Sequence, residues 1–181
     1  MIDDLPKLSL MEKRLTALER EVRELRQKHY MYDLAPIPEK LQIRCDEPGL
    51  LATQAYEVEK FDDGSRACWL GSAGAIQLKL PVAPARPFLC KLNIAPFHSV
   101  DLDELQLHVN DAPVDHAIEI LSQNLHRISF YGEARDQSFI NIMFSGINSI
   151  RPVDIGESQD VRLLAFQFFG AEIEFISATE E

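Results

Sequence analysis

Apolar residues in the first part of the chain recur at alternating intervals of three and four positions. The residues concerned are Leu8, Met11, Leu15, Leu18, Val22 and Leu25. This spacing puts them at the a and d positions of a heptad repeat, the pattern of a coiled coil. Residues 7–28 contain no Gly or Pro and are dominated by good helix formers, whereas Pro36 and Pro38 prevent a helix from continuing. The pattern predicts a coiled-coil oligomerisation stem over residues 1–34.

Charged residues beside this apolar seam predict how copies of the stem associate. Arg14 and Glu21 occupy g positions, and Glu19 and Arg26 occupy the e positions that follow them. In a parallel assembly each g residue faces the next e residue of a neighbouring helix, so both pairs have opposite charges. The run from Arg14 to Glu19 also resembles the Arg-h-x-x-h-Glu signature (h, apolar) of short trimeric coiled coils. We therefore expect a parallel homotrimer; the alternative is a single amphipathic helix packed on its own domain.

The pattern changes after Leu41, where short apolar or alternating runs are separated by turn-forming residues. The runs cover residues 75–80, 88–94, 104–109, 127–131, 139–144 and 163–169. Asn110-Asp111 is typical of a hairpin turn, and residues 115–124 fit a strand better than a short helix. Strands at this spacing, without amphipathic helices between them, predict a mainly β domain over residues 35–181. We expect an antiparallel, jelly-roll-like β-sandwich.

Composition and charge restrict the class of partner. A hydrophobic content of 46% and a charged content of 26% are typical of soluble globular proteins. The net charge of −11 argues against a nucleic-acid partner, because phosphate groups require a basic surface. No segment approaches the run of about 18 apolar residues that a membrane span needs, and the acidic first residues do not resemble a signal peptide. We therefore expect a cytoplasmic protein with neither a membrane nor a nucleic-acid partner.

The cysteines and the motif content give no sign of catalysis. Cys45, Cys68 and Cys90 are odd in number, widely spaced and without a CxxC pair, which favours neither disulfides nor zinc. Cys68 and Cys90 lie in apolar runs, where buried thiols are common. The sequence has no Gly-x-Ser-x-Gly, no His-Glu-x-x-His and no Gly-rich phosphate loop. It predicts a non-enzymatic protein with no cofactor and no metal.

A series of short motifs in the body has a familiar order. The motifs are Tyr56-x-x-Glu59, Arg66-Ala67-Cys68-Trp69, Leu107-His108-Val109-Asn110-Asp111, Ile140-Asn141-Ile142 and Arg151-Pro152-x-x-x-Gly156-x-Ser158-x-Asp160-x-Arg162. This order resembles the small β-sandwich modules appended to bacterial glycosyltransferases and other polysaccharide-assembly proteins, over about residues 49–175. Those modules tend to have a Glu before an Arg-Trp pair and a Val-Asn-Gly turn. Here Cys68 separates Arg66-Ala67 from Trp69, and Asp111 replaces the turn glycine.

Trp69, the only tryptophan, is the first candidate for a binding residue. Its ring can stack on the apolar face of a sugar, or it can belong to the core of the sandwich. Glu59 and Arg66 can offer hydrogen bonds to hydroxyl groups or form an ion pair across the turn between them. Asp160 and Arg162 would share one face of a strand and can either bind a ligand or fix the preceding loop. The sequence leaves both interpretations open for each candidate.

The segment that begins at His98 combines a histidine with several carboxylates. Asp101, Asp103 and Glu104 follow within six residues. These oxygens suggest a metal site, but their spacing matches no calcium-binding loop. We interpret the segment as a solvated acidic loop.

Together these patterns predict a non-catalytic homotrimer whose sandwich binds a glycan or docks to a glycosyltransferase. A shared stem would raise the avidity of shallow sugar sites. Two alternatives belong to another class of function. One is a structural module for protein–protein interaction, and the other is a phage-type trimeric receptor-binding or fibre component.

Overall fold

The computed structural model describes residues 38–53, 55–98 and 100–176. The chain divides after Pro38 into two units, and the described residues belong almost entirely to the second, Glu39–Glu181. The predicted stem over residues 1–34, from Leu8 to Leu25, lies outside the described residues. The coiled coil and the trimer therefore stay predictions.

The described part of the chain is mainly β, with a single short 3-10 helix, η1 (Pro152–Ile155). Its strands are β1 (Lys40–Arg44), β2 (Leu51–Ala52), β3 (Ala55–Lys60), β4 (Arg66–Leu70), β5 (Ile76–Leu80), β6 (Phe88–Pro96), β7 (Gln106–Val109), β8 (Ala112–Val114), β9 (His116–Ile120), β10 (His126–Gly132), β11 (Ile140–Ser145) and β12 (Phe166–Phe175).

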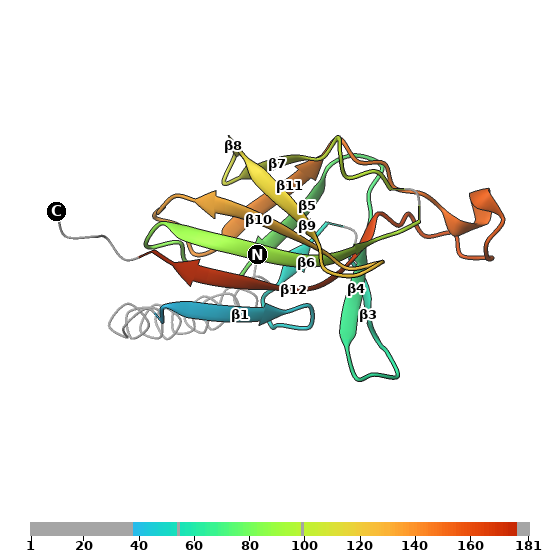
Figure 1. Cartoon of the computed structure of the whole chain (residues 1–181), viewed down its shortest axis with the longest axis horizontal. Coiled ribbons are helices and arrows are strands. Elements are labelled where there is room, and N and C mark those ends of the chain that lie inside the picture. Colours follow the sequence, from blue (N-terminus) through green and yellow to red (C-terminus); the bar gives the residue numbers. More distant parts are fainter. Residues whose placement is uncertain (1–37, 54, 99, 177–181) are drawn as a thin grey trace, which may run out of the picture. The chain divides into compact units, whose positions relative to one another are not determined.

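These strands form two antiparallel sheets that pack face to face (Figure 1). Sheet A has the order β3-β4-β12-β6-β10-β9, and β1 pairs with β12 outside this path. Sheet B has the order β2-β5-β11-β7-β8. The predicted mainly β, antiparallel sandwich is confirmed. Each apolar run identified in the sequence overlaps a strand, and residues 115–124 contain β9.

The core lies between the two sheets because each central strand alternates buried and partly exposed residues. In β6, Phe88, Cys90, Leu92 and Ile94 are all fully buried, and the residues between them face the other way. Phe144 of sheet B meets Phe166 of sheet A with ring centroids 5.2 Å apart and an angle of 64° between the rings. Such edge-to-face contacts join the two layers directly.

Strand β12 is the centre of sheet A. It pairs with β6 along one side, and on the other side with β4 in its first half and with β1 in its second half. The change of partner coincides with a bulge between Phe168 and Gly170. A Cβ atom on Gly170 would lie 2.5 Å from the carbonyl oxygen of Ile43, so only glycine lets β1 approach here.

The hairpin turn between β7 and β8 is the one predicted from Asn110-Asp111. Both residues have positive φ, 50° and 67°, as a two-residue type I′ turn requires. The Asn110 side-chain carbonyl accepts a hydrogen bond from the Asn141 backbone N–H, at 2.9 Å. Aspartate therefore replaces glycine at this turn without disturbing the hairpin.

The three cysteines are buried and free, as the apolar runs around Cys68 and Cys90 predict. Burial raises the pKa of the Cys68 thiol to about 11, and it raises the pKa of the Cys90 thiol further. Among the residues that the structure describes, no helix is long and apolar enough to cross a membrane.

Candidate functional site

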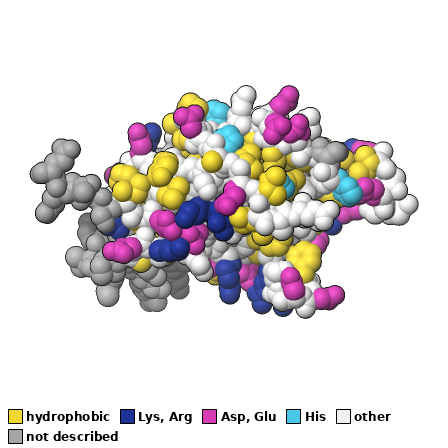
Figure 2. Space-filling view, viewed as in Figure 1, with side chains coloured by type: hydrophobic (Ala, Val, Ile, Leu, Met, Phe, Trp, Pro, Cys, Tyr) yellow, Lys and Arg dark blue, Asp and Glu magenta, His cyan; other side chains and the backbone are white. Residues whose placement is uncertain are grey.

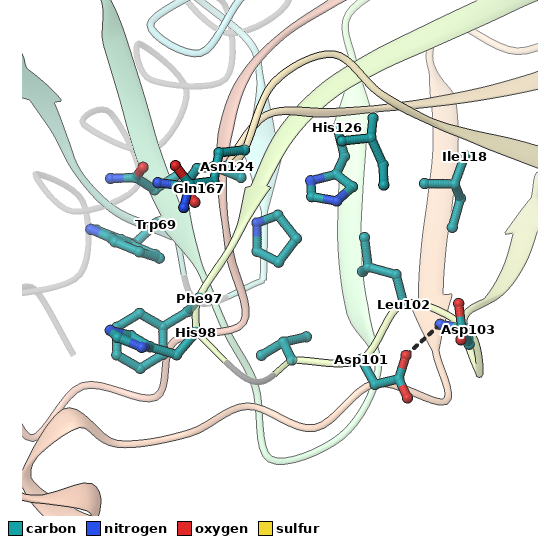
Figure 3. A pocket seen from close by; sticks show the side chains of 15 residues that line it. Trp69, Phe97, His98, Asp101, Leu102, Asp103, Ile118, Asn124, His126 and Gln167 are labelled. Atoms are coloured by element: carbon teal, nitrogen blue, oxygen red, sulfur yellow. Dashed lines mark hydrogen bonds between the residues drawn. The ribbon is translucent and has the colours of Figure 1, made fainter.

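A pocket of about 720 Å³ lies at one end of sheet A. Its walls come from the ends of β4, β6 and β9, the starts of β10 and β12, the loop 97–105, and the turn 121–125 between β9 and β10. The lining residues are Trp69, Ala95, Pro96, Phe97, His98, Val100, Asp101, Leu102, Asp103, Ile118, Ile120, Gln123, Asn124, His126 and Gln167. The pocket thus gathers residues that are far apart in the sequence (Figure 3).

One wall of the pocket is aromatic. Trp69 stands on the face of β4 opposite to the core, because its neighbours Cys68 and Leu70 are buried and Trp69 itself is half-buried. Phe97 packs against it edge to face, with ring centroids 5.6 Å apart and an angle of 81°. Phe97 in turn contacts the His98 ring at 4.8 Å. Trp69 therefore lines the pocket and does not belong to the sandwich core.

Amide side chains border this aromatic wall. Gln167 of β12 lies directly opposite Trp69 in the strand register, and Gln123 and Asn124 come from the β9–β10 turn. Figure 3 shows Gln167 and Asn124 next to the Trp69 ring. Each amide offers both hydrogen-bond donors and an acceptor. A flat apolar surface edged by such groups suits a ligand that has an apolar face and polar substituents.

The opposite wall combines aliphatic side chains with His126. Ile120 lies opposite His126 in the strand register and is 70% exposed. Leu102 and Ile118 belong to the same side of the pocket (Figure 3). The Nδ1 atom of His126 is buried and has no hydrogen-bond partner among the described residues. A buried polar atom without a partner costs about 1–3 kcal/mol.

Two carboxylates complete the lining. Asp101 Oδ1 accepts a hydrogen bond from the Asp103 backbone N–H at 2.8 Å, which fixes the turn that carries both residues. Both residues are exposed, and in Figure 3 they lie across the pocket from Trp69. The predicted acidic loop is therefore part of the pocket wall. No group of three or more His, Cys, Asp and Glu side chains suited to a metal ion is present in the described part of the chain.

The loop between β11 and β12 contacts the aromatic wall through His98. Glu157, just after η1, places its Oε2 atom 2.6 Å from Nε2 of His98. His98 has a φ of 42°, a left-handed conformation that is uncommon for histidine. Such backbone conformations persist where the surrounding structure holds them in place. The contact with Glu157 is one such restraint.

Three of the five candidate residues for glycan binding form a cluster of their own. The Arg162 guanidinium donates to both carboxylate oxygens of Asp160 at 2.7–3.0 Å, and its Nη1 lies 3.4 Å from Glu59 Oε1. It also lies over the Tyr56 ring, whose hydroxyl accepts a hydrogen bond from the Leu163 N–H. Hydrogen bonds from the side chain and backbone of Arg162 lower the pKa of the Asp160 carboxyl. We call this cluster, Glu59, Tyr56, Asp160 and Arg162, the latch; it ties the β11–β12 loop to β3.

Arg66 lies outside both the pocket lining and the latch. Its guanidinium forms an ion pair with Asp46, which Arg44 also contacts at 3.0 Å. The ion pair between Arg66 and Glu59 that the sequence allowed is not formed, because each residue has a different partner. Of the five candidates, Trp69 alone lines the pocket.

Several lining residues could not be found from the sequence. Asn124 and His126 are more than 40 residues from Gln167, and they reach the same pocket only through the pairing of β12, β6 and β10, which a single sequence does not reveal. The one sequence signal was the polar Ser122-Gln123-Asn124 turn between two apolar segments. The sequence predicts a loop that contains Asp101 and Asp103, but nothing in their spacing indicates that they lie opposite Trp69.

The fold and the pocket define a two-sheet antiparallel β-sandwich with a ligand-sized cavity at one end of sheet A. No known protein-family model matches the chain, and no curated protein sequence matches it significantly. Similarity to known proteins is found at the level of solved structures.

Two of these structures are carbohydrate-binding modules. One is the C-terminal family 6 module of LamC, a marine laminarinase from Zobellia galactanivorans, with 9% identity and a TM-score of 0.45; 75% of this chain and 98% of the module are covered. The other is a family 35 module from Clostridium thermocellum, with 9% identity and a TM-score of 0.44; 78% of this chain and 100% of the module are covered.

A third similar structure is an acetyl xylan esterase from the rumen bacterium Butyrivibrio proteoclasticus. Its identity is 9% and its TM-score 0.37, and the match covers 81% of this chain and 36% of the esterase. At these values the likeness of all three structures extends no further than the sandwich architecture.

Proposed function

We propose that this protein binds a glycan, without catalysing a reaction, in the pocket beside Trp69. The observation that supports the proposal is the position of this ring. Trp69 is half-buried on the outer face of β4, is packed edge to face on Phe97, and lines a cavity of about 720 Å³. Small-ligand pockets have volumes of about 300–1,000 Å³ and combine apolar walls with a few polar groups.

Sugars match this lining because they have two kinds of surface. The C–H groups of a pyranose form an apolar face that can stack on an indole ring, and the hydroxyl groups project from its edge. Gln167 and Asn124 lie where such hydroxyl groups would be, beside the ring. Their amides can both donate to and accept from a hydroxyl group. His126 supplies a further polar side chain on the opposite wall.

The predicted stem would join several copies of the pocket in one molecule. Open carbohydrate sites with few polar contacts bind weakly. Several pockets joined through residues 1–34 would raise the avidity for a repeating polymer by effective concentration. The proposal thus combines a binding site in the described domain with the homotrimer predicted from the sequence.

A titration with saccharides tests the proposal directly, because Trp69 is the only tryptophan and its fluorescence reports on the pocket. A ligand that stacks on the ring should shift the emission of the wild-type protein. Calorimetry should show that Trp69→Ala loses about tenfold or more in affinity, since a lost aromatic contact of about 1.4 kcal/mol corresponds to tenfold.

Tyr131→Ala is the matched control. Tyr131 is 67% exposed and stands at the opposite end of β10 from His126, about 17 Å away along the strand. Its removal should leave the affinity unchanged. A broad panel of oligosaccharides that neither shifts the emission nor releases heat would contradict the proposal.

A further inference from the structure

The charged side chains that line the pocket are acidic. Two carboxylates, Asp101 and Asp103, line it, and none of the described lining residues is Lys or Arg. The His98 imidazole does not offset them, because Glu157 Oε2 lies 2.6 Å from its Nε2. Any positive charge on this imidazole is thus balanced by Glu157.

Two basic side chains of neighbouring elements, Arg162 and Arg127, have partners outside the pocket lining. Arg162 is held by Asp160 and Glu59 in the latch. Arg127, next to His126 in β10, donates to Asn93 at 3.2 Å and lies 3.9 Å from Glu119. The carboxylates of Glu119, Asp160 and Glu59 pair with these two guanidinium groups. A ligand carboxylate in the pocket would thus meet two lining carboxylates and, among the described residues, no lining Lys or Arg.

The two lining carboxylates differ in what they can still bind. Asp101 Oδ1 is used by the Asp103 N–H, which leaves its second oxygen for a ligand. The Asp103 carboxylate makes no hydrogen bond or ion pair with another described residue, and the residue is exposed. Carboxylate oxygens accept hydrogen bonds from hydroxyl groups, and such charge-assisted bonds are stronger than neutral ones. They repel another carboxylate or a sulfate at the same distance.

We propose that Asp101 and Asp103 make the pocket selective for uncharged saccharides over those that contain uronic acid or sulfate groups. The inference rests on the proposed function and names the class of glycan that the site takes. Neutral sugars offer hydroxyl donors to both carboxylates, whereas acidic sugars bring a like charge into the pocket. The net charge of −11 acts in the same direction, but salt screens it beyond about 8–10 Å.

Pairs of oligosaccharides that differ only at C6, as a hydroxymethyl group or a carboxylate, test the selectivity. Glucose with glucuronate, galactose with galacturonate, and mannose with mannuronate oligomers form such pairs. In low salt, the neutral member of any pair that binds should bind at least tenfold more tightly to the wild-type protein. Calorimetry gives this ratio.

The variant Asp101→Asn with Asp103→Asn should reduce the ratio several-fold. Asparagine keeps the Oδ1 acceptor that Asp101 offers to the Asp103 N–H, so the turn is preserved. The control is Asp62→Asn with Asp136→Asn. Both side chains are exposed, lie outside the lining and change the net charge equally. The control variant should keep the wild-type ratio.

The outcomes separate this inference from the function on which it rests. No response of Trp69 to any saccharide would overturn glycan binding itself. Acidic oligomers that bind as tightly as neutral ones, with Trp69 responding to both, would overturn only the selectivity. A control variant that reduces the ratio as much as the Asp101 and Asp103 variant would assign the selectivity to overall charge and also overturn the inference.

Discussion

At the scale of single residues, the packing around two glycines of the β4–β5 connection differs sharply. A Cβ atom on Gly71 would lie 1.8 Å from the backbone carbonyl oxygen of Leu163, which belongs to the loop that leads into β12. A Cβ atom on Gly74 would meet nothing within 4 Å. Neither glycine has a positive φ, so the difference arises from space and not from backbone conformation.

Gly71→Ala should therefore lower the free energy of unfolding by about 2 kcal/mol or more, because the backbone of Leu163 must move to admit the methyl group. Urea denaturation followed by circular dichroism measures the change. Gly74→Ala is the control and should leave stability unchanged or raise it by about 0.5 kcal/mol, since alanine restricts the unfolded chain. Equal effects of both substitutions would show that the close approach at Gly71 does not exist.

The roles of Trp69 and of the latch residues could be predicted from the sequence only in part. A single tryptophan stands out by its rarity, and the structure places it in the pocket. Asp160 and Arg162 were recognisable as a pair, but the sequence could not show that their hydrogen bonds would be made mainly to each other and to Glu59. Arg66 was grouped with Glu59 because they flank one turn. Its actual partner, Asp46, is 20 positions away.

At the scale of elements, the central strands and the edge strand β9 could be predicted from the sequence, whereas the edge strands β2 and β3 could not. β5, β6 and β11 alternate fully buried and partly exposed residues, which produces a clear apolar period. β3 lies at the edge of sheet A, and none of its residues is buried. Tyr56 and Val58 alternate with Glu57 and Glu59, but this run is too short to establish a strand by itself, and β3 is held by its pairing with β4. The pocket depends on these pairings, so its composition could not be predicted either.

The ion pair of Asp160 and Arg162 in the latch should make the free energy of unfolding depend on pH. Asp160→Asn should lower the free energy of unfolding by about 1 kcal/mol at pH 7, because it removes the charge that Arg162 pairs with. Arg162 lowers the pKa of Asp160 in the folded protein below the ordinary value of 3.8. The stabilisation is therefore present above about pH 4 and is lost as the pH falls through the folded-state pKa.

Urea denaturation at pH 7 and at about pH 3 checks this dependence, with the difference between wild type and Asp160→Asn shrinking at the lower pH. Asp62→Asn serves as the control, since Asp62 is exposed at the tip of the β3–β4 turn. It removes the same charge and should have little effect at either pH. A constant difference between wild type and Asp160→Asn at both pH values would contradict the assignment of the latch as an ion pair.

At the scale of the whole molecule, the outer face of sheet A is charged but internally balanced. Lys40 and Lys91 each lie within 3.4 Å of both Glu172 and Glu174, so four alternating charges form a closed group over β1, β6 and β12. Figure 2 shows acidic and basic side chains next to each other on this face. This part of the exposed sheet therefore presents no surface of one sign.

Association of the whole molecule is predicted to depend on residues 8–25. Leu15→Asp with Leu18→Asp puts two charges into the predicted seam, so we expect a monomer, whereas the wild-type protein should have the mass of a trimer by light scattering. Thr16→Asp with Arg20→Asp, outside the a and d positions, is the control and should stay oligomeric. An oligomer that survives the Leu15 and Leu18 changes would assign association to the β-sandwich.

The central place of β12 in sheet A has a consequence for how the protein is made. β12 follows β1, β4 and β6 in the sequence, yet it is the partner of all three. During translation these strands leave the ribosome before the segment that completes their hydrogen bonds. A nascent chain halted before Phe166 would present unpaired, apolar strand edges, the surfaces that chaperones recognise and that aggregate in their absence. Completion of sheet A thus waits for β12, and the pocket cannot form on the growing chain before Gln167 is synthesised.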